Sequence, residues 1–168
     1  MIGREGMTKS FLLNAFADCG ASKPESFLST GNFAFTLGEG ELKEFENEIS
    51  RVIAKTLGRV EPVFCRSLTY ITSLIESGPF QGKDDPKIYE RCVSFLSQAP
   101  SSSLVLPIVS KRGDVEVFKL AKAEAFSTTR LIGGRTSSAG TILEPVLESK
   151  VTTRNWNTLL RLYSRTFK

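Results

Sequence analysis

Residues 25–58 have the sequence ESFLSTGNFAFTLGEGELKEFENEISRVIAKTLG, in which the hydrophobic pattern changes half-way along. Up to Leu37 apolar residues alternate on both sides of Ser29-Thr30-Gly31-Asn32, which is typical of two strands joined by a turn. From Leu42 to Leu57 apolar residues recur at helical spacing, and Gly58 is suited to cap the end of that helix. A β-hairpin followed by an amphipathic helix indicates an α+β fold.

The sequence around this stretch predicts further elements of both kinds. Those of the first half are a helix over Thr8–Cys19 with Thr8 as N-cap, strands over Glu25–Leu28 and Phe33–Leu37, a helix over Leu42–Leu57, a strand over Val60–Arg66, and a helix after Ser67. Those of the second half are a strand over Lys87–Leu96, a helical or irregular segment over Ser101–Val109, strands over Val115–Leu120 and Ala125–Leu131, a helix over Thr141–Ser149, a strand over Val151–Thr153, and a helix over Asn155–Phe167.

The two halves show the same order of elements, except that the first half lacks an opening strand. A strand-helix-strand-strand-helix-strand unit is the ferredoxin-like pattern, with helices on one face of an antiparallel sheet. We therefore predict a duplication of two ferredoxin-like halves, residues 1–80 and 87–168, joined by a polar linker. The prediction rests on element order, since the halves show no residue-level repeat.

Composition narrows the class of protein. Hydrophobic residues make up 40% and charged residues 24% of the 168 residues, as in ordinary globular proteins. The chain has no apolar run long enough to span a bilayer, and charges within the first twenty residues argue against a secretory signal. Three widely spaced cysteines, Cys19, Cys65 and Cys92, suit free thiols in a reducing compartment. We expect a cytoplasmic protein without membrane contact.

The chain contains no histidine, which excludes catalytic triads with histidine, Cys-His pairs and histidine-ligated metals. It also has no CxxC pair and no calcium-loop spacing, so we expect neither a metal nor a cofactor. Glu144 and Glu148 are four residues apart on a predicted helix, but a solvated helical face explains this spacing better than an acid–base pair. The sequence therefore identifies no catalytic residue, and it favours a protein that is not an enzyme.

Positive charge is concentrated at the C-terminal end, where the last nineteen residues contain five basic residues and no acidic one. One interpretation is an amphipathic helix with a solvated basic side. The other is an anion site, because the free amides at the start of a helix and an arginine fork both favour phosphate or carboxylate. The candidate anion-binding residues are Thr152, Thr153, Arg154 and Asn155, with Arg135 after Gly133-Gly134 as a second wall.

Two segments resemble the domain of unknown function 1697 family. The hairpin sequence Phe27-Leu28-Ser29-Thr30-Gly31-Asn32-Phe33-Ala34-Phe35 is similar to that family's hairpin signature, and Val151-Thr152-Thr153-Arg154-Asn155-Trp156-Asn157-Thr158 is similar to its most recognisable string. The resemblance implies a bacterial, intracellular protein of two ferredoxin-like halves without an established activity. Family members open with a strand that this chain lacks, so we expect a truncated chain or a misassigned start.

Three classes of function are open at this point. The leading class is binding of nucleic acid or of a phosphorylated small molecule through the basic C-terminal helix. The second class is a small-molecule enzyme or binder with a cleft between the halves, to which Ser29, Thr30 and Asn32 would contribute. The third class is a protein–protein interaction module that uses an uncovered strand edge. The sequence leaves the oligomeric state open.

Overall fold

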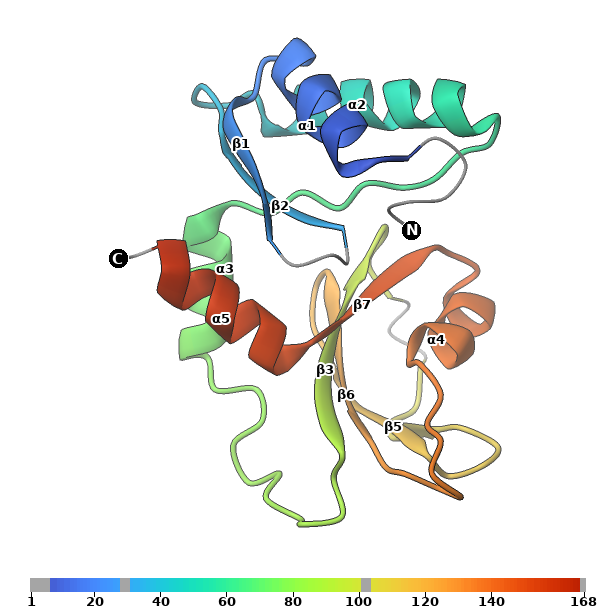
Figure 1. Ribbon diagram of the computed structural model, residues 1–168. Helices are drawn as coiled ribbons and strands as arrows, with labels where there is room; N and C mark the ends of the chain where they lie inside the picture. Colours follow the sequence, from blue (N-terminus) through green and yellow to red (C-terminus); the bar gives the residue numbers. More distant parts are fainter. Residues whose placement is uncertain (1–6, 28–30, 101–103, 167–168) are drawn as a thin grey trace. The chain divides into compact units, whose positions relative to one another are not determined.

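The computed structural model describes residues 7–27, 31–100 and 104–166, which fall into two compact units (Figure 1). The first unit ends at Ser67 and contains α1 (Lys9–Asp18), β1 (Ser22–Phe27), β2 (Asn32–Thr36) and α2 (Leu42–Leu57). The second unit begins at Leu68 and contains α3 (Leu68–Glu76), β3 (Glu90–Leu96), β4 (Ile108–Val109), β5 (Val115–Leu120), β6 (Glu124–Thr129), α4 (Gly140–Leu147), β7 (Val151–Asn155) and α5 (Trp156–Thr166). The strands of these residues pair antiparallel, which confirms a mixed α/β fold with antiparallel sheets.

The ends of α1 follow from local hydrogen bonding. Thr8 is the N-cap, and its side-chain oxygen accepts a hydrogen bond from the backbone N–H of Phe11 at 3.1 Å. At the other end Gly20 adopts a φ of +97°, a conformation that glycine allows without strain. The backbone N–H of Ala21 then donates to the carbonyl of Phe16, which closes a Schellman motif. Both predicted helix ends are therefore confirmed.

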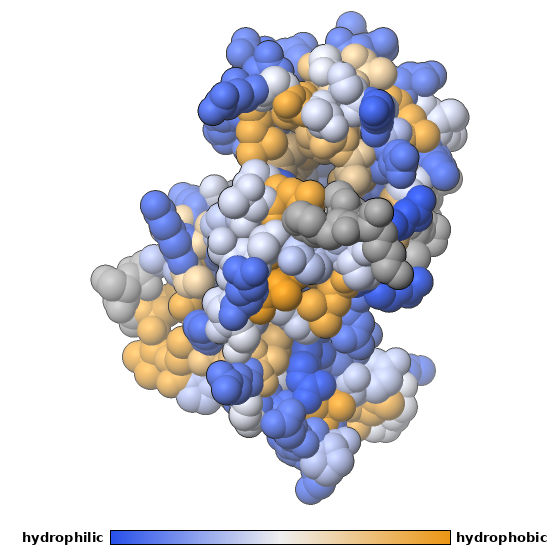
Figure 2. Space-filling model, turned by 90° about the vertical axis from the view of Figure 1, so that its left-hand side faces the viewer, coloured by the Kyte–Doolittle hydropathy of each residue, from blue (hydrophilic) through white to orange (hydrophobic). Residues whose placement is uncertain are grey.

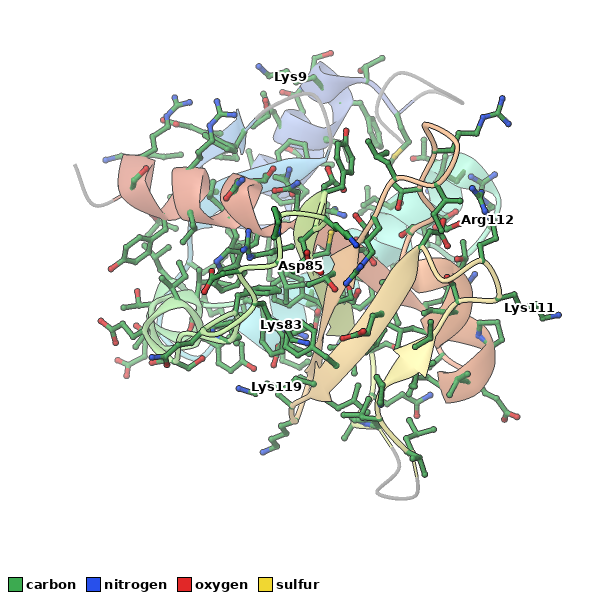
Figure 3. The ribbon with its side chains drawn as sticks, turned by 90° about the horizontal axis from the view of Figure 1, so that it is seen from below. Lys9, Lys83, Asp85, Lys111, Arg112 and Lys119 are labelled. Atoms are coloured by element: carbon green, nitrogen blue, oxygen red, sulfur yellow. The ribbon has the colours of Figure 1, made fainter. Side chains whose placement is uncertain are left out.

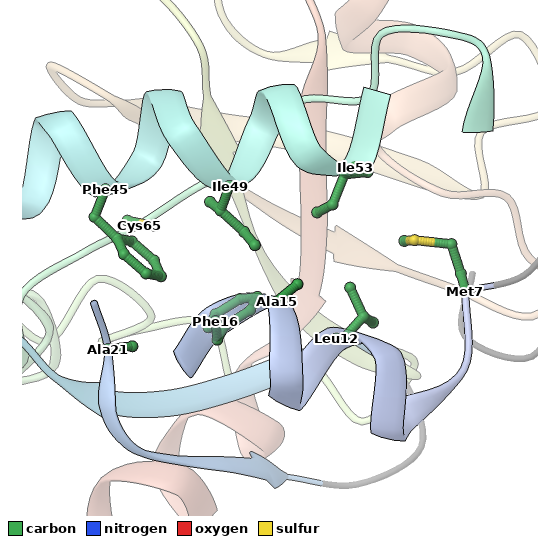
Figure 4. Close-up of a cluster of buried hydrophobic side chains, with 9 residues drawn as sticks. All are labelled: Met7, Leu12, Ala15, Phe16, Ala21, Phe45, Ile49, Ile53 and Cys65. Carbon is green, nitrogen blue, oxygen red and sulfur yellow. The ribbon is translucent and has the colours of Figure 1, made fainter. Parts of the chain in front are cut away.

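The core of the first unit lies between the two helices and the β1–β2 hairpin. Phe16 of α1 has its ring centroid 4.9 Å from that of Phe33 and 5.2 Å from that of Phe35, both on β2. Phe45 of α2 completes this group of four rings, 5.4 Å from Phe16. Ile49, fully buried on α2, extends the same cluster (Figure 4). The helical periodicity of residues 42–57 therefore places one apolar stripe on the hairpin.

The predicted strand over Val60–Arg66 is wrong, because these residues have no strand pairing in the structure. A strand requires a neighbour, and the sheet of the first unit consists, in the described residues, of β1 and β2. Val63 and Cys65 still pack on the core cluster, and the backbone N–H of Cys65 donates to Oε1 of Glu46 at 3.1 Å. The alternation of apolar residues thus predicts the buried side chains but not the backbone pairing.

The second unit is built on a five-stranded antiparallel sheet of order β4-β5-β6-β3-β7. Residues that face each other across an antiparallel pair lie on the same side of a sheet. Ser94 of β3 is opposite Ala125 of β6 and Thr153 of β7, whereas Val93 is opposite Phe126 and Arg154. The sheet therefore has one face that includes Ser94 and one that includes Val93.

Helices cover both faces of this sheet. On one face α4 buries Leu143 against Leu96, Val115 and Val117. On the other face α5 packs on β3 and β7, and α3 packs on α5 (Figure 1). Trp156 of α5 lies there beside Phe126, with ring centroids 6.3 Å apart. The sequence predicted that the helices cover one face of the sheet. In the structure α4 covers one face, and α3 and α5 lie on the other face.

Two further differences concern the order of elements. In residues 97–100 and 104–109, the structure shows irregular chain and the short strand β4, so it favours the irregular alternative for that segment. The division between domains at residues 81–86 stays a prediction; in the structure α3 packs with α5 in the second unit. The buried Ile71 of α3 explains this placement, since α3 needs a partner helix for its apolar side.

Candidate anion-binding surface

The four predicted anion-binding residues of the C-terminal string lie on β7 and do not form one group. Alternate residues of a strand point to opposite faces of a sheet, so Thr152 and Arg154 face the α5 side while Thr153 and Asn155 face the α4 side. The side chain of Thr153 is hydrogen-bonded to that of Ser94, with 2.8 Å between the two oxygens. These residues directly precede α5 in the sequence, but because they form a strand their side chains point to opposite faces of the sheet.

The guanidinium of Arg154 is engaged within its own strand. Its Nη1 donates to Oγ1 of Thr152 at 2.6 Å and to the carbonyl of Thr153 at 2.9 Å. Burial lowers the pKa of the Arg154 guanidinium from its ordinary value. Both of these contacts are to residues of β7 itself.

Asn155 caps α5 and at the same time brings a carboxylate to the start of that helix. Its Oδ1 accepts a hydrogen bond from the backbone N–H of Asn157 at 2.9 Å, as an N-cap side chain does. Its Nδ2 donates to Oε1 of Glu90 at 3.0 Å. The negative charge of Glu90 opposes an anion at this helix start, so the dipole argument from the sequence loses weight here.

Arg135, the fifth predicted residue, lies in a different place, on a tight turn after β6. Ile132 and Arg135 exchange backbone hydrogen bonds, at 2.9 and 3.3 Å between nitrogen and oxygen. Between them Gly133 and Gly134 have φ values of +60° and +73°. Two successive positive φ values are the requirement of a type I′ turn, which glycine satisfies without strain. The Gly-Gly pair therefore places Arg135 directly after a tight turn.

A second turn, between β4 and β5, lies against the first. The backbone N–H of Gly113 donates to the carbonyl of Ser110 at 2.8 Å, so Lys111 and Arg112 are the two central residues of a turn. Nη2 of Arg112 donates to the carbonyl of Ile132 at 2.9 Å, which joins the two turns. We call residues 110–113 and 131–135 together the basic tip.

The basic tip presents three cationic side chains to solvent. Lys111, Arg112 and Arg135 are exposed, and Figure 3 shows Lys111 pointing away from the sheet. In the part of the chain that the structure describes, none of the three is paired with a carboxylate. By contrast, Nη2 of the nearby Arg130 lies 2.8 Å from Oδ2 of Asp85. Sequence analysis missed Lys111 and Arg112, although a Lys-Arg-Gly turn between two strands was a usable signal.

The carboxylate of Asp114 fixes the basic tip from beneath. Asp114 is 1% exposed, and it accepts hydrogen bonds from Oγ of Ser110 at 2.6 Å and from the backbone N–H of Ser137 at 2.8 Å. The first bond orders the turn that carries Lys111, and the second holds the chain that follows Arg135. The hydrogen bond from Ser110, together with those from Ser137, lowers the pKa of Asp114 to about 2.

This depressed pKa predicts a pH dependence of stability. A carboxylate whose folded pKa lies below its unfolded value contributes stability above the unfolded pKa and loses it as the pH falls through the folded pKa. We expect Asp114 to contribute above about pH 4 and to lose this contribution as the pH falls to about 2. Urea denaturation of the wild type and Asp114→Asn should show less pH dependence in the variant across this range. Identical pH profiles would show that Asp114 is not responsible.

Two features beside the cations bear on the kind of ligand. Tyr89 is 54% exposed, and its backbone N–H donates to the carbonyl of Thr129 at 2.8 Å, so it stands at the end of the sheet that carries the basic tip. Leu131 and Ile132 on the tip are also partly exposed. Figure 2 shows a different side of the molecule, on which hydrophobic and hydrophilic residues both reach the surface. An aromatic ring and aliphatic groups beside cations suit a ligand with both charged and flat apolar parts.

The remaining residues of interest from the sequence have structural roles or lie outside the description. Glu144 accepts hydrogen bonds from the backbone N–H of Val151 and from Nζ of Lys150, which ties α4 to β7. Ser29 and Thr30 lie outside the described residues, and Asn32 begins β2.

The three cysteines are free thiols, as the sequence predicted. Burial raises the pKa of Cys65 and of Cys92 to about 12, and it also raises that of Cys19. A raised pKa leaves a thiol protonated near neutral pH, so these side chains are poor nucleophiles.

Comparison with known families assigns the chain to one of them. Residues 2–126 match the family model described as protein of unknown function (DUF1697), which is more than half of the chain. The chain belongs to this family. The matched part of this DUF1697 member includes the β1–β2 hairpin and stops before the string at residues 151–158, which also suggested the resemblance. No curated protein and no solved structure matches it.

No helix in residues 7–27, 31–100 and 104–166 is long and apolar enough to cross a membrane. The same residues contain no cluster of three or more acidic or cysteine side chains placed to hold a metal ion.

Proposed function

We propose that the chain binds single-stranded nucleic acid through the basic tip of its second unit. The observation that supports this most is the joining of two turns by the Arg112–Ile132 hydrogen bond, which brings Lys111, Arg112 and Arg135 to one end of the sheet. Each of the three cations is exposed and is not paired with a carboxylate in the described residues. These observations support the tip, rather than α5, as the binding surface in this proposal.

The side chains of the tip favour a phosphodiester backbone over a single compact anion. An arginine guanidinium offers a fork of donors that matches two phosphate oxygens, and lysine adds a point charge. Cations on two separate turns suit several phosphates in a row, as a nucleic acid chain offers. Tyr89 at the same end of the sheet provides a ring on which an unpaired base can stack.

Salt-dependent binding tests this proposal. The probe is a fluorescent oligothymidylate of about 12 nucleotides, and its anisotropy is measured between about 50 and 200 mM salt. The triple variant Lys111→Ala/Arg112→Ala/Arg135→Ala is expected to bind at least about tenfold more weakly. Its plot of log affinity against log salt should lose about 2 units of slope, roughly 0.7 for each phosphate contact.

A matched control variant distinguishes the effect of losing the tip cations from the effect of losing positive charge in general. Lys9, Lys55 and Lys122 are exposed lysines elsewhere on the chain, with Lys122 in the turn at the opposite end of the β5–β6 hairpin. Replacing these three by alanine removes the same charge from the formal net charge of +4 and should leave the salt slope unchanged. Equal losses in both triple variants, or undetectable binding by the wild type at low salt, would contradict the proposal.

The ferredoxin-like character of the halves is also a proposal. Its support in the second unit is that α4 connects β6 to β7, which lie on either side of β3 and run parallel to each other. This split strand-helix-strand arrangement is characteristic of ferredoxin-like units. In the first unit the order helix, hairpin, helix supports the same ancestry. An experimental structure superposed on both halves would test it.

Two coarser properties are proposed with it. We propose that the chain forms two domains. Their boundary lies either in residues 81–86, as the sequence predicted, or at Ser67, where the two compact units divide. Limited proteolysis distinguishes these two boundaries. We also propose a cytoplasmic location, supported by the free thiols of Cys19, Cys65 and Cys92.

A further inference from the structure

Arg130 is a further cation beside the basic tip, and it is paired with a carboxylate. Its backbone N–H donates to the carbonyl of Asp114 at 2.8 Å, so its backbone is joined to the residue that fixes the tip from beneath. Nη2 of its side chain lies 2.8 Å from Oδ2 of Asp85. Arg130 therefore differs from the three tip cations, none of which is paired with a carboxylate in the part of the chain that the structure describes.

Arg130 also lies between the tip and the aromatic ring of Tyr89. The pairing of β3 with β6 ends with Glu90 opposite Thr129. Tyr89 comes directly before this pair and Arg130 directly after it, and the backbone N–H of Tyr89 still donates to the carbonyl of Thr129. The tip itself begins at the next residue, Leu131. A nucleic acid chain that reaches from the tip cations to Tyr89 therefore passes Arg130.

The carboxylate of Asp85 is presented by a turn in the chain that precedes β3 (Figure 3). Its Oδ1 accepts a hydrogen bond from the backbone N–H of Lys87 at 2.9 Å, and its carbonyl accepts one from the N–H of Ile88 at 3.0 Å. The other carboxylate oxygen is the one that pairs with Arg130. The two paired side chains are 43% exposed for Arg130 and 39% exposed for Asp85. An ion pair with this exposure is weak, because water and salt screen it, so another anion can replace the carboxylate at small cost.

From this arrangement we propose that Asp85 competes with a nucleic acid phosphate for the guanidinium of Arg130. This inference rests on the proposed function of the basic tip and concerns the regulation of that same site. In the free chain Arg130 is paired with Asp85, and in the complex a phosphodiester takes the place of the carboxylate. A guanidinium accommodates either anion, because its donors match the oxygens of both. The internal carboxylate therefore lowers the affinity of the chain for nucleic acid in proportion to the molecules in which it occupies Arg130.

The experiment compares four forms of the complete chain with the same fluorescent oligothymidylate: the wild type, Asp85→Asn, Arg130→Gln and the double variant. Asparagine removes the charge of Asp85 but keeps an Oδ1 that can accept the hydrogen bond from Lys87, so the turn is retained. We expect Asp85→Asn to bind about two- to fivefold more tightly than the wild type, which is the range that an exposed ion pair allows. This gain should disappear when Arg130 is glutamine, because competition requires the guanidinium.

Asp84→Asn is the matched control, because it removes the same charge from the adjacent residue. The side chain of Asp84 is 88% exposed, and its Oδ1 lies 3.6 Å from Nη2 of Arg91. This control should change the affinity by less than about 1.5-fold. Emission of Trp156 verifies that each variant is folded.

Two results would overturn the inference through its mechanism. Equal gains in Asp84→Asn and Asp85→Asn would show an effect of charge in general. An undiminished gain in the Arg130→Gln background would show that Asp85 does not act through Arg130.

A third result separates this inference from the proposed function. Unchanged affinity in Asp85→Asn, while the wild type binds and the triple variant of the tip binds more weakly, overturns the inference alone. Absence of binding by the wild type and by Asp85→Asn at low salt overturns the proposed function, and the competition with it.

Discussion

Replacing Phe126 by alanine is expected to lower the free energy of unfolding of the second unit by about 3–5 kcal/mol, the range for large-to-small changes at buried aromatic positions. Phe126 on β6 is 1% exposed. Its ring centroid lies 5.8 Å from that of Phe80 and 6.3 Å from that of Trp156. Alanine would leave a cavity between β6 and α5 that neighbouring rings fill incompletely. The packing of Phe80 and Trp156 in this part of the core therefore depends on the ring of Phe126.

The measurement is urea denaturation followed by the fluorescence of Trp156, the single tryptophan of the chain. Because Trp156 packs beside Phe126, its emission reports directly on this core. Val105→Ala at an exposed position of the same unit is the control and should change the free energy by less than about 0.5 kcal/mol. Equal midpoints for Phe126→Ala and the control would contradict the described packing.

Replacing Phe16 by alanine is expected to lower the free energy of unfolding of the first unit by a similar amount, about 3–5 kcal/mol. Phe16 is 4% exposed, and its ring is within 5.4 Å of those of Phe33, Phe35 and Phe45, measured between centroids. Loss of the ring removes contacts with both β2 and α2. The hairpin has no further strand in the described residues, so it relies strongly on these contacts.

Amide hydrogen exchange measures this second effect, because the slow amides of α2 report on opening of the first unit. In Phe16→Ala the amides of Ile49 and Ile53 should exchange much faster than in the wild type. Val60→Ala, a change at an exposed position of the first unit, is the matched control and should leave their exchange unchanged. Slow exchange at Ile49 in Phe16→Ala would show that the four rings are not the centre of this core.

Local patterns in the sequence predicted those helices and strands whose positions depend on interactions between residues close together in the sequence. The caps at Thr8 and Gly58, the helical stripe of α2 and the bounds of β5 depend on neighbours in sequence, and they are found as expected. The predicted strand at Val60–Arg66 failed because strand pairing depends on a partner that local sequence does not reveal.

The candidate site was predictable in part. Arg135 after Gly133-Gly134 was identified because two glycines predict a turn and arginine binds anions. Its neighbour Arg112 was missed, because the hydrogen bond to Ile132 joins turns that are 20 residues apart. The sequence predicted a strand over Val151–Thr153 and a helix from Asn155, and in the structure β7 continues to Asn155. The side chains of Thr153 and Arg154 therefore point to opposite faces of the sheet, which the prediction of one anion site did not take into account.

The most direct test of nucleic acid binding at the basic tip is an NMR titration of the complete chain with the same oligothymidylate. If the basic tip binds nucleic acid, backbone amide shifts change first at residues 110–113 and 131–135, with smaller changes at Tyr89. Changes centred on the exposed Arg161 and Arg165 of α5, with the tip unaffected, would contradict it and restore the C-terminal helix as the binding surface.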